Sequence, residues 1–199
     1  MPVESARRSG ILLKLFIGYL NDCCRINKAS SRLDDDYRAR NISYRPGLFS
    51  WQGVGVALLL HWITGGLGIT LGWHRLLSHR SFQTPKWLEY FLAFCGTLAL
   101  QGGIIWWVGL HRHHHLHSDE DVDHHDSKKG FLWSHVRWMC FEIPAESDIP
   151  RFTKDIADDP FYQFLNNYFF PLQVVLGVIL YAIGGWSFVF WGVFARLVV

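Results

Sequence analysis

Apolar and polar residues fall into long blocks along the 199-residue chain. Residues 47–73 contain no Asp, Glu, Lys or Arg over 27 consecutive positions. A helix needs about 20 apolar residues to cross the hydrocarbon core of a bilayer. Trp51 and Trp73 stand near the two ends of this block, and tryptophans favour the two membrane interfaces. The pattern therefore predicts a membrane-spanning helix over about 47–73.

A second apolar block covers residues 87–110, but we expect it not to cross the membrane. If it crossed, about 30 Å of hydrocarbon would separate His74 and His79 from the histidines that follow residue 110. Basic residues flank both ends of the block, and such residues favour the cytoplasmic side. The block therefore predicts an interfacial helix, or one buried against other helices, with both ends at the cytosolic face.

The last apolar block, residues 169–199, is 31 residues long and would measure about 46 Å as a continuous helix. It is long for one span and short for two, and Gly184 and Gly185 interrupt it. We expect a helix that enters the membrane, turns near the two glycines and starts back. A polar N-terminal arm over 1–46 and a cytosolic cap over 111–168 complete the organisation, with 47–199 as the membrane domain. The predicted fold class is all-α, with integral membrane helices and a histidine-rich helical cap.

Composition and charge exclude several classes of protein. Half of the residues are apolar and 16% are aromatic, so the chain is not a disordered tail. The 19 Lys and Arg nearly balance the 17 Asp and Glu, and the net charge of +2 offers no basic footprint for a nucleic acid. The four cysteines form no C-x-x-C pair, which fits a reducing compartment.

The histidines are concentrated next to the predicted membrane helices. Seven of the 11 lie within residues 111–125. His111, His114 and His115 are related as i, i+3 and i+4, which places three imidazoles on one helix face. His74 and His79 are five residues apart, about 140° around an ideal α-helix. We therefore expect the helix end to unwind between them so that both can reach one point.

This histidine pattern predicts a metal site. Neutral imidazole suits iron, zinc, copper and nickel, and five imidazoles suit a site with more than one metal ion. The chain contains neither the Glu-x-x-His pattern of carboxylate di-iron bundles nor the H-E-x-x-H pattern of zinc proteases. The candidate ligands are His74, His79, His111, His114 and His115.

Other polar residues of the cap have two open interpretations. His113 points away from the face of the triplet. Like His117, His124 and His125, it is either solvated or supports the ligands from outside. The acids either hydrogen-bond to ligand imidazoles and fix their tautomers or form a solvated face. These acids are Asp119, Glu120, Asp121, Asp123 and Asp126.

The two histidine clusters have the forms H-x-x-x-x-H and H-x-x-H-H, within GITLGWHRLLSHRS (68–81) and WVGLHRHHHLHS (107–118). With GFLWSHVRW (130–138), they resemble the membrane-bound fatty-acyl desaturases of the Δ9, stearoyl type, and the bacterial acyl-lipid branch above all. The resemblance runs from about residue 47 to the last residue. It implies a di-iron centre at the cytosolic membrane face, with His74, His79, His111, His114 and His115 as iron ligands.

The same resemblance implies an oxidoreductase that introduces a cis double bond into a saturated fatty-acyl chain, with the acyl carrier left open among lipid, coenzyme A and acyl carrier protein. It implies O₂ as co-substrate and two electrons from a ferredoxin or cytochrome b5-type donor protein. The C–H bonds of a saturated chain are not acidic, so the cofactor carries the difficult chemistry and we expect no catalytic acid or base among the side chains.

The sequence departs from the family pattern after His135. Family members carry a third histidine box and one further histidine ligand near the C-terminus, and no histidine follows His135 here. We therefore expect a truncated member in which at least one metal ion lacks ligands. Three functions stay open: a desaturase that depends on ligands from a separate polypeptide, a non-catalytic membrane fragment, and an acyl-chain hydroxylase.

Overall fold

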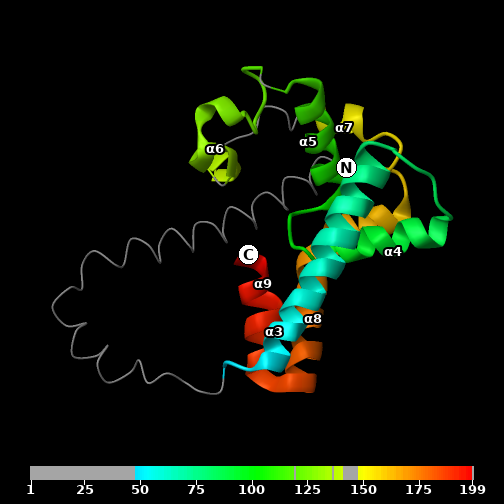
Figure 1. The fold of residues 1–199 in the computed structure, drawn as a ribbon. Coiled ribbons are helices and arrows are strands. Elements are labelled where there is room, and N and C mark those ends of the chain that lie inside the picture. The colour runs from blue at the N-terminus through cyan, green and yellow to red at the C-terminus, as the bar shows by residue number, and fades with distance from the viewer. Residues whose placement is uncertain (1–47, 119, 136, 141–147, 199) are drawn as a thin grey trace.

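A computed structural model describes residues 48–118, 120–135, 137–140 and 148–198, so the predicted polar arm over 1–46 lies outside the described residues. Within the described part, Figure 1 shows helices and connecting segments and no strand, which confirms the all-α fold class. In chain order the elements are α3 (Trp51–His61), η1 (Trp62–Ser78), α4 (Lys86–Thr97), α5 (Ile104–Leu116), η2 (Ser127–Lys129), α6 (Phe131–His135), η3 (Arg137–Cys140), α7 (Ile149–Phe152), α8 (Pro160–Val189), η5 (Phe190–Ala195) and α9 (Arg196–Val198).

The first long helix consists of α3 followed without a break by η1, which is wound as a π-helix. Ser50 begins it, because its side-chain oxygen accepts a hydrogen bond of 2.9 Å from the Gly53 N–H. The helix runs from Trp51 to Ser78, and its 28 mostly apolar residues are enough to cross a membrane. It extends five residues beyond residue 73, so the first histidine cluster lies on its last turns and just after them.

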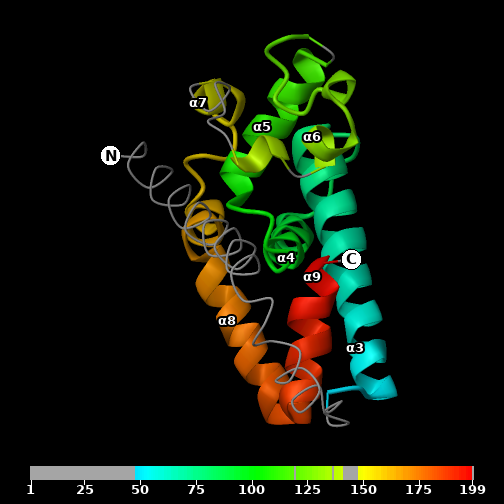
Figure 2. The same ribbon diagram turned by 90° about the vertical axis from the view of Figure 1, so that its left-hand side faces the viewer.

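The second long apolar stretch, Pro160–Val198, is also long enough to cross a membrane, and it starts nine residues before residue 169. Its backbone is non-helical at Gly184 and Gly185, and Gly185 has a φ of 63° that favours glycine. Figures 1 and 2 show α8 running away from the cap and η5 and α9 returning beside it. Leu180 and Val193 pack together between the two arms.

The apolar block 87–110 contains two helices, α4 and α5, separated by a break at 98–103. Positive φ angles at Leu100 and Gly102 turn the chain there. α4 lies across the long helices and is seen end-on in Figure 2. The Trp73 indole N–H fixes α4 to η1 by donating to the Ala93 carbonyl at 3.0 Å. α5 then rises toward the cap and carries the second histidine cluster to the end of η1.

The core lies where η1, α4, α5 and α8 meet. Its fully buried side chains include those of Trp73, Ile104, Val108, Tyr162 and Leu165. Large apolar side chains on α3, on the start of η1 and on the part of α8 farther from the cap are instead exposed, which suits contact with lipid. They include Leu58, Leu59, Trp62, Val174, Val175, Val178, Ile179 and Ile183.

Candidate metal centre

The winding of η1 brings His74 and His79 together. A π-helix hydrogen-bonds residues that are five apart, and the His79 N–H donates to the His74 carbonyl at 3.0 Å. The two Nε2 atoms are 3.0 Å apart, and the ring centroids are 4.5 Å apart. The expectation that the helix end unwinds between these residues is therefore wrong. A wider helical turn joins the pair while the backbone stays hydrogen-bonded.

α5 contributes a second pair, His111 and His115, which are one turn apart on the helix. Their Nε2 atoms are separated by 3.1 Å. The ring of His74 lies 4.7 Å from that of His111, and the ring of His79 lies 4.4 Å from that of His115. The candidate ligand atoms of all four lie within 4.8 Å of one another. Two metal–nitrogen bonds on opposite sides of an ion span about 4 Å, so the four imidazoles are close to the spacing of a single metal ion.

His114, the fifth predicted ligand, lies on the same helix but outside this group of four. Its ring centroid is 6.2 Å from that of His111, and its Nδ1 lies 2.8 Å from Asp123 Oδ1. The Asp123 side chain is only 1% exposed. This contact engages Nδ1 and leaves Nε2 of His114 for a metal ion. For Asp123, the geometry therefore favours a hydrogen bond to a candidate ligand over a solvated position.

The other acids of the cap have different surroundings. Glu120 is 60% exposed in its side chain and contacts His117 Nδ1 at 2.8 Å, so it touches none of the five candidate ligands. Asp126 is buried and accepts a hydrogen bond from the Lys128 N–H. Asp121 is exposed, and Asp119 lies outside the described residues.

His113 is buried, so the solvated alternative does not apply to it. Its ring packs against His117 and Phe152, at centroid distances of 4.6 and 5.9 Å, and lies 6.1 Å from the ring of His124. Burial is the main cause that lowers the pKa of His113, and burial lowers the pKa of His124 to about 4. This second group of rings depends on the packing of α7 against α5, for which the sequence pattern carries no signal.

Two of the candidate ligands on α5, His111 and His115, have lowered pKa values that favour their neutral form. Burial lowers the pKa of His111 to about 3, and the neighbouring imidazoles, first His115 and then His74, act in the same direction. Burial also lowers the pKa of His115. Neutral imidazole is the form that binds a metal ion. The Trp107 indole stacks on the His111 ring at 4.8 Å and 14°, which restrains its orientation.

Comparison with known proteins relates this arrangement to one family. The family described as fatty acid desaturase matches residues 49–199. The chain is 67% identical over 156 residues to the sn-1 stearoyl-lipid 9-desaturase of Anabaena variabilis, which covers 78% of this chain and 57% of that protein.

More distant relatives extend the comparison. The chain is 63% identical over 157 residues to the sn-1 stearoyl-lipid 9-desaturase of Synechocystis sp., covering 79% of this chain and 49% of the relative. It is 46% identical over 155 residues to the chloroplastic palmitoyl-monogalactosyldiacylglycerol delta-7 desaturase of Arabidopsis thaliana, covering 77% and 42%. The chain thus spans about half the length of the relatives that it matches.

Proposed function

Because the chain is a membrane protein that belongs to the fatty acid desaturase family, we propose that it acts in the O₂-dependent introduction of a cis double bond into a fatty-acyl chain of a membrane lipid. The observation that carries this proposal is the convergence of His74, His79, His111 and His115 within 4.8 Å. Relatives with this function in their names act on stearoyl- or palmitoyl-lipids, which makes a saturated acyl-lipid the proposed substrate.

The donor set fits a di-iron centre. The four converging imidazoles would hold one iron ion, and His114 Nε2 would contribute a ligand to a second ion. Bound iron would supply the redox chemistry that O₂-dependent removal of unactivated hydrogens requires. Two electrons would come from a ferredoxin or cytochrome b5-type donor protein.

The chain's own residues would position the ligands. Trp107 restrains the ring of His111, and Asp123 fixes the orientation of His114. The site lies at the cap end of the first long helix, where an acyl chain could reach it from the bilayer. We place this end at the cytosolic face. His79 and His115 are exposed, which leaves one side of the site open to a donor protein.

Iron binding by the detergent-solubilised chain tests this proposal. We expect at least one iron per chain after anaerobic loading, measured by elemental analysis, and loss of that iron in the triple variant H111A/H114A/H115A. The control is H61A, because His61 is exposed in the first long helix and outside the histidine group. Unchanged iron in the triple variant would refute the ligand assignment.

Turnover separates the remaining alternatives. The iron-loaded chain is reconstituted with a stearoyl glycerolipid, O₂ and reduced ferredoxin, and the acyl products are analysed by mass spectrometry. An unsaturated product two mass units lighter supports desaturation, whereas a product with an added oxygen supports hydroxylation. Iron without turnover, or no iron at all in the wild-type chain, would favour a non-catalytic membrane fragment.

A further inference from the structure

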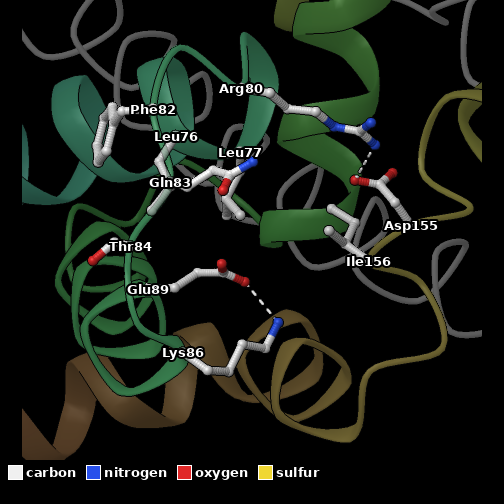
Figure 3. Close-up of a pocket in the computed structure, with 10 residues that line it drawn as sticks. All are labelled: Leu76, Leu77, Arg80, Phe82, Gln83, Thr84, Lys86, Glu89, Asp155 and Ile156. Atoms are coloured by element: carbon white, nitrogen blue, oxygen red, sulfur yellow. Dashed lines mark hydrogen bonds and ion pairs between the residues drawn. The ribbon is translucent and has the colours of Figure 1, made fainter.

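An arginine directly follows a candidate ligand in each histidine cluster, in the pairs His79-Arg80 and His111-Arg112, and both of these arginines reach the same carboxylate. Arg112, which follows His111, contacts Asp155 through two hydrogen bonds, Nη1 to Oδ1 at 2.7 Å and Nη2 to Oδ2 at 3.0 Å. Arg80, which follows His79, contacts Asp155 Oδ2 through Nη2 at 2.7 Å. Figure 3 shows the Arg80–Asp155 pair at the edge of a pocket of about 360 Å³.

Arg112 also bridges the two helix ends directly. Its Nη2 donates to the Leu77 carbonyl at 2.5 Å, on the last turn of η1. Its Nη1 donates to the Phe152 carbonyl at the end of α7. One planar guanidinium thus connects α5, η1 and the segment that carries Asp155. Because the guanidinium group is planar and its donor nitrogens have a fixed geometry, it sets the distance and orientation between the segments that it connects.

Asp155 supplies the negative charge that both guanidinium groups contact among the described residues. The Arg112 side chain is 14% exposed, so its charge is largely removed from water. Burial opposes the ionisation of Asp155, but hydrogen bonds from Arg112 and Arg80 overcome it and lower its pKa to about 2. Asp155 is therefore a carboxylate shared by two guanidinium groups. Without that negative charge, the two arginines would repel each other and Arg112 would be buried unpaired.

The backbone at Arg80 forms the turn from which its side chain reaches Asp155. Arg80 has a φ of 49°, in the left-handed region where glycine is favoured and other residues are strained. The turn closes the helix, with the Ser81 N–H donating to the Arg75 carbonyl at 2.9 Å. It also directs an arginine to Asp155 immediately after a candidate ligand.

We propose that Asp155 is a positioning residue of the metal centre, which holds the His74–His79 pair and the His111–His115 pair in register through Arg80 and Arg112. The inference rests on the proposed function of the four histidines. Removing a residue that hydrogen-bonds a metal ligand directly typically weakens metal binding by about 10–100-fold. Asp155 contacts the neighbours of the ligands and not the ligands themselves, so we expect the lower end of that range. Arg112 makes the larger contribution, because Arg80 is 64% exposed and water screens its ion pair.

The test is metal affinity in the full chain, with cobalt(II) as the probe in anaerobic detergent solution. D155N preserves the shape of the side chain and removes its charge. We expect its cobalt dissociation constant to rise by about 10-fold, with a changed ligand-field spectrum and unchanged helical circular dichroism. The matched control D158N alters an exposed aspartate three residues away and should bind cobalt as the wild type does.

Two further variants keep the test decisive if D155N folds poorly. R112K keeps the positive charge but loses the planar guanidinium group that donates two hydrogen bonds to Asp155. It should weaken cobalt binding nearly as much as D155N. R80Q removes only the exposed ion pair between Arg80 and Asp155 and should weaken cobalt binding less. Wild-type cobalt affinity and spectrum in folded D155N, or in R112K if D155N does not fold, would overturn the inference while leaving the proposed function intact. Absence of cobalt binding in the wild type would instead refute the metal centre.

Discussion

Replacing Gly68 with alanine should force η1 and α4 apart and destabilise the fold. An added Cβ would lie 2.3 Å from the Gly96 nitrogen and 2.5 Å from both the Cys95 carbonyl carbon and the Gly96 Cα. All three neighbours are backbone atoms, so no side-chain rotation can relieve the contact. The shortest distance falls about 1 Å below the 3.4 Å at which ordinary van der Waals contact begins. The two helices would have to separate by about that amount.

Overpacking a core typically costs about 1–3 kcal/mol. Because only backbone movement can accommodate this methyl group, we expect G68A to lower the free energy of unfolding by about 3 kcal/mol, the upper end of that range. The assay is reversible unfolding in mixed micelles with increasing SDS, followed by circular dichroism. G55A is the matched control, because a Cβ at Gly55 of α3 would meet no atom within 4 Å.

The two alanine substitutions should act in opposite directions. Alanine favours a helix over glycine by up to about 1 kcal/mol, so G55A should be neutral or slightly stabilising. The reasoning would be refuted if G68A unfolded within about 0.5 kcal/mol of the wild type, the range of ordinary surface substitutions. Since Gly68 precedes His74 by under two helical turns, G68A should also weaken metal binding more than G55A does.

Two further predictions concern single histidines. H113A should leave the iron content nearly unchanged and lower the thermal stability. The reason is that the buried His113 ring packs on His117 and Phe152 and not on the four converging histidines. A large loss of iron would show that the wrong face of α5 was assigned. The metal-free chain should lose stability as the pH falls from 6.5 toward 3. His111 has a pKa of about 3 in the folded chain and 6.5 in the unfolded chain, so in this pH range the unfolded chain binds a proton that the folded chain does not. Above pH 6.5, His111 no longer makes the stability depend on pH. H111Q should therefore show a weaker dependence of stability on pH than the wild type below pH 6.5. Equal slopes of stability against pH in both proteins would contradict the lowered pKa of His111.

The sequence predicts the elements that depend on local pattern. The all-α class follows from the apolar blocks, and the close approach of His111 and His115 follows from their i, i+4 spacing. The π-winding of η1 cannot be obtained in this way, because periodicity arguments assume 3.6 residues per turn. That assumption places His74 and His79 on different sides of the helix, whereas the structure joins their Nε2 atoms at 3.0 Å.

Features that depend on tertiary packing are also absent from the pattern. His113 looks like one more member of a polar tract until α7 packs against α5, where Gly109 allows Ile149 and Thr153 to approach closely. Asp155 likewise stands in an ordinary polar segment and gains its role only when two distant arginines reach it. The sequence contains the His-Arg pairs, but no sequence pattern predicts that Arg80 and Arg112 share Asp155 as a partner.

The placement of His114 follows from helix geometry and bears on the proposed two-ion centre. Successive residues are about 100° apart around an α-helix, so His114 is rotated by about 100° from His115 and about 60° from His111. His111 and His115 differ by only about 40°, which lets both face the pair on η1. One ion therefore cannot easily use all three imidazoles of the H-x-x-H-H cluster. The cluster thus divides into the pair His111 and His115, whose Nε2 atoms lie 3.1 Å apart, and the single imidazole of His114, which Asp123 orients away from that pair. In the proposed centre, the pair would serve one ion and His114 the adjacent one.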